Sequence, residues 1–106
     1  MGFFDFFHGP DINRGVEAYR SAPGAVLLDV RTPEEYRQGH IPGSKNLPLH
    51  ALEGAGALIE DQDSPVYVYC QSGARSRQAA AILGRMGYQQ VTNLGGISAW
   101  RGKVER

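Results

Sequence analysis

The chain has almost no cysteine, no long hydrophobic run and no excess of either charge. Its single cysteine, Cys70, cannot form an internal disulfide and lacks the partners of a cysteine-based metal site. No apolar run approaches the roughly 20 residues that a membrane-spanning helix requires. Eleven Lys and Arg residues balance eleven Asp and Glu residues, which argues against a broadly cationic nucleic-acid-binding protein. We therefore expect a cytoplasmic protein with no membrane span, no nucleic-acid partner, no metal and no cofactor.

The N-terminal segment differs in composition from the remainder of the chain. All four phenylalanines lie within residues 3–7, and this segment lacks the basic start and cleavage site of a signal peptide. Gly2 begins a myristoylation-like pattern, but Phe6 stands where that motif has Ser or Thr. We expect residues 1–10 to form an apolar arm over the domain's own core, with contact to a partner or membrane surface as the alternative. Residues 11–106 are sufficient for one domain.

Segments typical of strands and helices alternate along the chain. Runs of aliphatic, β-branched or aromatic residues predict four strands, at residues 25–28, 44–47, 66–69 and 90–94. Helical spacing and capping residues predict helices at residues 11–21, 32–38, 49–60 and 76–86, and a last helical turn at 97–101. The start at Thr32 is the most specific, because Pro33 and Glu35 complete a capping box. This alternation predicts an α/β domain with a mainly parallel sheet.

The candidate functional residue is Cys70, directly after the strand predicted at 66–69. Open parallel sheets bind ligands beyond the carboxyl ends of their strands. The short or flexible residues at 71–75 allow successive backbone N–H groups to face the Cys70 sulfur as an anion-binding nest. The following helix N-terminus and the charge of Arg75 favour thiolate, so we expect the pKa of Cys70 to lie below its usual value. An inert buried cysteine is the alternative, but a loop rich in donors favours a reactive thiol.

Three separated motifs resemble those of the rhodanese family of sulfurtransferases. LDVRTPEEY at residues 28–36 and GHIPGSKNLP at 39–48 resemble the first family signature, and GGISAW at 95–100 resembles the C-terminal one. The resemblance extends from about Asp11 onward. It implies an α/β fold with a mainly parallel five-stranded sheet flanked by helices on both faces. It also implies a ping-pong cycle, in which the Cys70 thiolate takes a sulfane sulfur from a donor, forms a persulfide and passes the sulfur to a nucleophile.

The residues predicted to bind the sulfur or its donor follow Cys70 directly: Gln71, Ser72, Gly73, Ala74, Arg75 and Ser76. Arg75 is expected to hold an anionic donor by a forked contact, and Gly73 to adopt a backbone angle that other residues resist. Asp29 and Arg31 either orient this loop as an ion pair or support the fold elsewhere. The expected partners are thiosulfate or a persulfide as donor and cyanide or a thiol as acceptor, and a protein partner remains open.

Two other functions compete with this prediction of a thiosulfate sulfurtransferase. Phosphatases and arsenate reductases also place Cys and Arg on an anion-binding loop, but their Arg stands six positions after the Cys, whereas Arg75 is five after Cys70. The six-residue loop suits a persulfide better than a tetrahedral oxyanion, and arsenate reduction through a second cysteine of this chain is impossible. The second alternative is a rhodanese-like sulfur carrier or regulatory binding module without efficient thiosulfate turnover.

Overall fold

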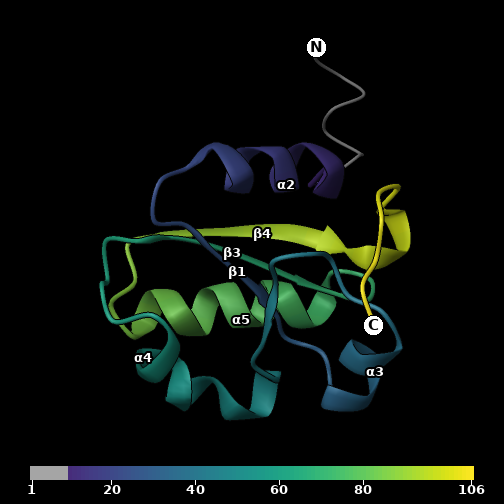
Figure 1. The fold of residues 1–106 in the computed structure, drawn as a ribbon. Helices are drawn as coiled ribbons and strands as arrows, with labels where there is room; N and C mark the ends of the chain where they lie inside the picture. The colour runs from purple at the N-terminus through teal and green to yellow at the C-terminus, as the bar shows by residue number, and fades with distance from the viewer. Residues whose placement is uncertain (1–9) are drawn as a thin grey trace, which may run out of the picture.

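The computed structural model describes residues 10–106, which form a parallel sheet with helices on both faces (Figure 1). The strands, in the spatial order β2-β1-β3-β4, are β1 (Val26–Asp29), β2 (Lys45–Asn46), β3 (Pro65–Cys70) and β4 (Gln90–Gly96). The helices are α2 (Ile12–Ser21), α3 (Pro33–Gln38), η1 (Leu49–Gly54), α4 (Ala55–Leu58), α5 (Ala74–Arg85) and η2 (Ile97–Ala99). The predicted arm, residues 1–10, lies outside the described part of the chain except for Pro10.

The sheet has four strands in the described residues, so the expectation of five strands is wrong. The strand patterns in the sequence account for four segments only, and the fifth strand rested on the family resemblance alone. Outside these strands, the structure has one isolated antiparallel bridge, between His40 and Glu105. The α/β class and the parallel sheet are confirmed, since every pair of neighbouring strands runs parallel.

Two separate hydrophobic clusters hold the helices against the sheet. Leu28 and Val68 belong to the cluster on the face covered by α5, whereas Leu27 and Tyr69 belong to the cluster with α2. Because successive strand residues point to opposite faces, one short strand contributes to both clusters. Figure 1 shows α2 on one side of the strands and α5 with α4 on the other. The central strands β1 and β3 are therefore buried on both faces, as the near-continuous apolar runs in the sequence predict.

Local sequence signals explain where the helices start and where two predictions fail. The capping box at α3 is confirmed, since the Thr32 hydroxyl accepts from the Glu35 N–H and the Glu35 carboxylate accepts from the Thr32 N–H. The helix predicted at 76–86 starts earlier, at Ala74, because Gly73 caps it. The helix predicted at 49–60 is divided into η1 and α4, with a kink at Ala51 and no side-chain cap on either piece.

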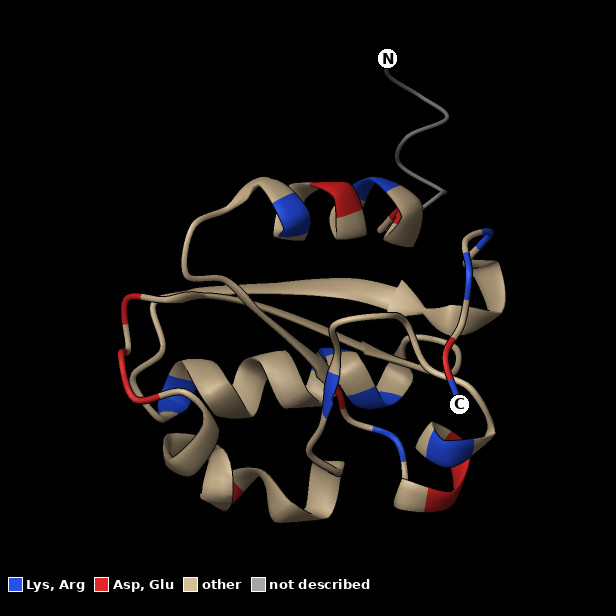
Figure 2. Cartoon of the chain, viewed as in Figure 1, with Lys and Arg blue, Asp and Glu red and all other residues tan. Residues whose placement is uncertain are grey.

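Basic and acidic residues are interspersed along α2 and α3 and over the other elements (Figure 2). Among the described residues, no helix is long and apolar enough to cross a membrane.

Candidate active site

Cys70 is the last residue of β3, at the carboxyl end of a central strand. Its side chain is buried, with a residue exposure of 1%. The Gly73 N–H donates to Cys70 Sγ at 3.0 Å, and the Ser76 hydroxyl oxygen lies 3.5 Å from the same sulfur. The chain thus turns back on itself after β3, so that the residues of the loop and of the first turn of α5 surround the thiol.

Burial alone would raise the pKa of the Cys70 thiol, because a buried thiolate loses hydration. Hydrogen bonds from the Ser76 hydroxyl and from the backbone N–H groups of Ser76, Gly73 and Ser72 outweigh this effect. The pKa of Cys70 therefore lies below its ordinary value, which is the direction expected from the sequence. Of the other N–H groups predicted to face the sulfur, those of Ala74 and Arg75 belong to the first turn of α5.

Arg75 does not lie free beside the thiol. Its guanidinium forms two hydrogen bonds with the Glu35 carboxylate, at 2.7 Å to Oε1 and 3.0 Å to Oε2. Hydrogen bonding from Arg75 is also the largest cause that lowers the pKa of Glu35, to about 2. The sequence predicted that Arg75 holds an anionic donor, and it did not reveal Glu35, a partner that lies 40 residues earlier in the chain. Glu35 was missed as a neighbour of the site because its capping-box role already explained it.

Two glycines determine the path of the loop. Gly73 has φ +107°, in the left-handed region, which agrees with the backbone angle predicted for it. Gly96, on β4, was missed: a Cβ at this position would lie 2.6 Å from Ser72 Cα and closer still to Gln71 O. The Ser98 N–H donates to Gln71 O at 3.2 Å, so η2, which follows β4 directly, also supports the loop. The pair Gly95-Gly96 after a predicted strand was the available signal for this close approach.

Asp29 and Arg31 form a buried ion pair, with Nη2 of Arg31 2.7 Å from Oδ2 of Asp29. Arg31 also donates through Nη2 to Gly39 O at 2.7 Å and through Nη1 to the Gln71 side-chain oxygen at 3.3 Å. The Asn46 amide, which the sequence analysis missed, donates to the carbonyl oxygens of both Asp29 and Arg31. Of the two interpretations left open for this pair, the geometry favours the one in which it contacts the loop.

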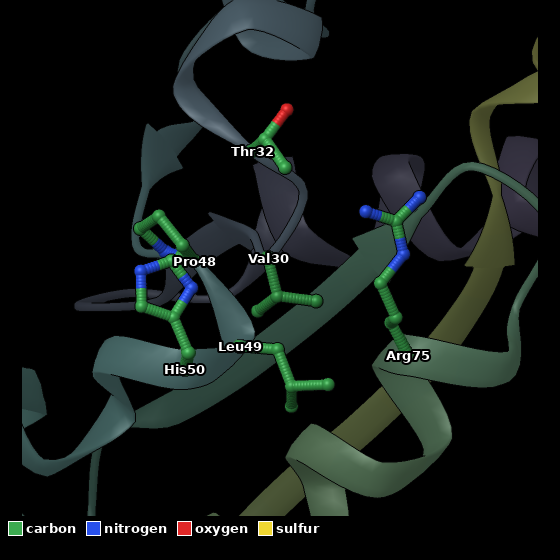
Figure 3. A pocket seen from close by; sticks show the side chains of 6 residues that line it. All are labelled: Val30, Thr32, Pro48, Leu49, His50 and Arg75. Atoms are coloured by element: carbon green, nitrogen blue, oxygen red, sulfur yellow. The ribbon is translucent and has the colours of Figure 1, made fainter.

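Two pockets adjoin the loop. One, of about 410 Å³, is lined by Val30, Thr32, Pro48, Leu49, His50 and Arg75. In Figure 3, Arg75 rises on one side of this pocket, Pro48 and His50 lie on the other, and Val30 and Leu49 lie between them. The other pocket, of about 470 Å³, is lined by Ser72, Gly73, Ala74 and Arg77 from the loop and α5 and by residues that include Asn93 and Ser98. Of the predicted loop residues, Ser72, Gly73, Ala74 and Arg75 line these pockets, whereas Gln71 and Ser76 line neither.

Known proteins with similar sequences include a sulfurtransferase of Allochromatium vinosum, 49% identical over 71% of this chain and 70% of its own length. The thiosulfate sulfurtransferase PspE of Escherichia coli is 44% identical over 66% of this chain and 68% of its own length. An uncharacterized protein of Bacillus subtilis, YqhL, is also 44% identical, over 76% of this chain, and the match spans 64% of its own length.

The fold is likewise similar to that of solved structures. A rhodanese with anions from E. coli has a TM-score of 0.73 and 37% sequence identity, covering 77% of this chain and 98% of that one. The human single-domain sulfurtransferase TSTD1 has a TM-score of 0.71 and 29% identity, covering 82% of this chain and 89% of that one. The family model described as the rhodanese-like domain matches residues 14–103. The chain belongs to the rhodanese-like family.

Proposed function

We propose that the chain is a sulfurtransferase of the thiosulfate sulfurtransferase type, which moves a sulfane sulfur through a persulfide on Cys70. The observation that carries the proposal is the 3.0 Å hydrogen bond from the Gly73 N–H to Cys70 Sγ, in a loop that lowers the pKa of this thiol. A thiolate is the nucleophile that sulfur transfer requires, and an already ionised thiol needs no general base. The names of two relatives, a sulfurtransferase of A. vinosum and the thiosulfate sulfurtransferase PspE, support the same chemistry.

The first half-reaction attaches sulfur to Cys70. The thiolate attacks the sulfane sulfur of the donor, a Cys70 S–S bond forms, and the donor's own bond to that sulfur breaks with its electron pair leaving on the donor. The outer sulfur of the persulfide carries the negative charge. Backbone N–H groups at Ser72, Gly73 and Ser76, which already stabilise the thiolate, are placed to stabilise this charge as well.

The second half-reaction returns the enzyme to its starting state. A nucleophile such as cyanide or a thiol attacks the outer sulfur, and the S–S bond breaks with its electron pair returning to Cys70 Sγ. The Arg31–Gln71 contact, 3.3 Å long, and the Asp29 carboxylate that holds Arg31 keep the start of the loop in place during both steps. The roles of Asp29 and Arg31 are therefore positioning roles.

The structure also bears on the phosphatase alternative. An arginine that binds a phosphate ester must direct its guanidinium to the phosphate oxygens, whereas both terminal nitrogens of Arg75 are bound to Glu35. Sulfur transfer needs no such clamp, since its charge develops on one sulfur atom beside the backbone donors. This supports the persulfide chemistry over phosphate hydrolysis.

The test is intact-protein mass spectrometry after incubation with thiosulfate or a small-molecule persulfide. We expect one added sulfur atom on the wild-type chain, its removal by cyanide with release of thiocyanate, and neither event with Cys70→Ala. Substantial thiocyanate formation by Cys70→Ala would refute the mechanism. A persulfide that forms on Cys70 but is passed neither to cyanide nor to a thiol at an appreciable rate would instead favour the sulfur-carrier alternative. Hydrolysis of an aryl phosphate at a rate comparable to sulfur transfer would favour the phosphatase alternative.

A further inference from the structure

Of the three arginines near the reactive loop, Arg31 and Arg75 are bound to carboxylates, whereas Arg77 lines the other pocket. Arg31 pairs with Asp29 at 2.7 Å, and Arg75 pairs with Glu35 at 2.7 Å. A site that recognises a small dianion needs cationic charge that the protein has not already neutralised. A sulfur donor that enters the pocket lined by Arg75 therefore meets a guanidinium whose charge is compensated by Glu35.

Glu35 is fixed in this position by more than Arg75. Its Oε1 accepts from the Thr32 N–H at 2.9 Å and lies 3.2 Å from the Thr32 hydroxyl, as part of the capping box of α3. The side chains of Arg75 and Glu35 are 35% and 30% exposed, so water screens this pair only in part. Because the carboxylate is held from two sides, the pair is a built feature of the site and not a mobile surface contact.

The pocket beside this pair is apolar on its inner wall. Val30 and Leu49 lie between Arg75 and the side formed by Pro48 and His50 (Figure 3). Two links join the pocket to the reactive loop: the Val30 N–H donates to Tyr69 O at 3.0 Å, one residue before Cys70, and Arg75 belongs to the turn that follows it. A volume of about 410 Å³ is far larger than a thiosulfate ion needs, and it can accommodate an aromatic or branched aliphatic group.

We propose that the preferred sulfur donor is a singly charged organic sulfane compound whose apolar group lies in this pocket, and that Glu35 establishes this preference over inorganic thiosulfate by compensating the charge of Arg75. The inference rests on the proposed sulfurtransferase function and specifies its substrate class. Glu35 acts here as a specificity-determining residue that need not touch the reacting sulfur.

The transfer step balances for both donor classes. With a thiosulfonate, the Cys70 thiolate forms a bond to the outer sulfur, the S–S bond of the donor breaks, and a sulfinate leaves with the electron pair. With thiosulfate, the same step releases sulfite. Thiosulfate is a dianion and the thiosulfonate is a monoanion. The carboxylate of Glu35 therefore repels thiosulfate more strongly than it repels the thiosulfonate.

The experiment compares kcat/KM for thiosulfate and for benzenethiosulfonate, with cyanide as acceptor, in the wild type and in Glu35→Gln. Gln keeps the capping box, since Glu and Gln both serve at this position. A Coulomb energy is proportional to the product of the charges, so a threefold gain for the monoanion corresponds to about a ninefold gain for the dianion. We expect the wild type to prefer benzenethiosulfonate and Glu35→Gln to shift the ratio toward thiosulfate by about threefold or more.

The matched control is Glu34→Gln, one residue earlier on α3. It removes the same charge, but Glu34 is 73% exposed and pairs only with Arg37, at 3.7 Å, in the described residues. We expect Glu34→Gln to leave the ratio of the two kcat/KM values within twofold of the wild type, since water screens exposed charges.

A second pair of variants tests the apolar half of the proposal independently of Glu35. Leu49→Ala removes part of the inner wall of the pocket, and we expect kcat/KM for benzenethiosulfonate to fall about fivefold or more, consistent with the loss of a buried aliphatic contact, while thiosulfate is affected less than twofold. Leu58→Ala, at an exposed leucine of α4, is the control and should change neither value.

The outcomes separate this inference from the proposed function. A wild-type preference for thiosulfate, or equal effects of Glu35→Gln on both donors, or equal effects of Leu49→Ala on both, would overturn the donor proposal while leaving sulfur transfer intact. Absence of a Cys70 persulfide with either donor would overturn the sulfurtransferase function itself.

Discussion

Hydrogen bonds from Ser76 and from the backbone of the loop oppose the effect of burial on the ionisation of the Cys70 thiol. Burial raises its pKa, and the contacts from Ser76 and from the backbone of the loop lower it by more. Ser76 is itself buried, and its hydroxyl oxygen lies 3.1 Å from Gly73 O and 3.5 Å from Cys70 Sγ. Beside the neutral thiol the hydroxyl donates to Gly73 O and accepts from the Cys70 S–H, whereas beside the thiolate its single proton turns to the sulfur.

The first prediction is that Ser76→Ala makes the Cys70 thiol harder to ionise. A hydrogen bond to a charged group contributes about 1.5–3 kcal/mol, so the alkylation profile should move to higher pH by about one to two pH units. The direction follows from the contact, because the hydrogen bond that the Ser76 hydroxyl donates to a charged thiolate is stronger than the one that the neutral thiol donates to the Ser76 oxygen. The measurement is the rate of iodoacetamide alkylation between pH 5 and pH 10.

Ser98→Ala provides the control for this substitution. Ser98 reaches the loop through its backbone N–H, which donates to Gln71 O and is retained in the alanine variant. We expect its alkylation profile to coincide with that of the wild type. A profile for Ser76→Ala that also coincides with the wild type would mean that the backbone N–H groups alone lower the pKa.

A second prediction at this scale compares two ion pairs, the buried pair Arg31–Asp29 and the exposed pair Arg37–Glu34. Arg31→Met leaves Asp29 buried without its partner, and breaking a buried pair in this way costs about 3–5 kcal/mol of the free energy of unfolding. Arg37→Met breaks a pair whose side chains are 68% and 73% exposed, which should cost about 0.5 kcal/mol or less. Urea unfolding of both variants checks the difference, and comparable losses would contradict the burial of the Arg31–Asp29 pair.

At the scale of secondary-structure elements, β4 is the support on which the reactive loop lies. Its register with β3 shifts after Val68, so that Tyr69 pairs with Gly95 and Cys70 with Gly96. The side chain of Asn93 stabilises this irregularity by accepting from the Gly95 N–H at 2.9 Å. The extra residue in β4 brings glycine, which has no side chain, directly beneath the loop at the point of closest approach.

The third prediction is therefore that Gly96→Ala displaces the loop. The added methyl group would collide with the backbone of Gln71 and Ser72, which cannot rotate away as a flexible side chain can. We expect a loss of about 1–3 kcal/mol in the free energy of unfolding, which is typical of overpacking, and loss of most persulfide formation. Unfolding in urea and intact mass after incubation with donor measure the two effects.

Gly84→Ala is the matched control on α5. A Cβ at Gly84 meets nothing within 4 Å, and alanine is the better helix former by up to about 1 kcal/mol. This variant should be at least as stable as the wild type and form the persulfide normally. If Gly96→Ala behaves like Gly84→Ala, the close approach of β4 does not determine the loop.

The sequence predicts those elements whose signals are local. Thr32, Pro33 and Glu35 lie within four residues, and the helix they predict is present. The β-branched and aromatic residues at 66–69 likewise predict the buried strand at whose end Cys70 lies. The partner of Arg75 and the role of Gly96 depend on residues that meet only after the sheet has formed, so no local pattern reveals them. The described residues form four strands, and the prediction of a fifth rested on the family resemblance and on no strand pattern in the sequence.

For the whole molecule, the sheet is the shared wall of two hydrophobic clusters. Leu27 is 1% exposed in the cluster with α2, and Leu28 is 0% exposed in the cluster with α5. Substitutions at these two neighbouring residues of β1 therefore test the two hydrophobic clusters separately, on opposite faces of the sheet. Because β1 pairs with β3 along its whole length, neither cluster can be lost without removing support from the other.

The fourth prediction follows from this shared wall: the two clusters unfold as one cooperative unit. Leu27→Ala and Leu28→Ala should each lower the free energy of unfolding by about 2–5 kcal/mol, the usual cost of truncating a buried leucine. Trp100 fluorescence reports on the cluster with α2, and far-UV circular dichroism includes the contribution of α5. In each variant, the two methods should give the same urea midpoint. Both variants should also keep the wild-type dependence of stability on urea, since the same surface becomes exposed. Separate midpoints in either variant would show that one cluster unfolds while the other persists, and the loop at the end of β3 would then depend on one layer only.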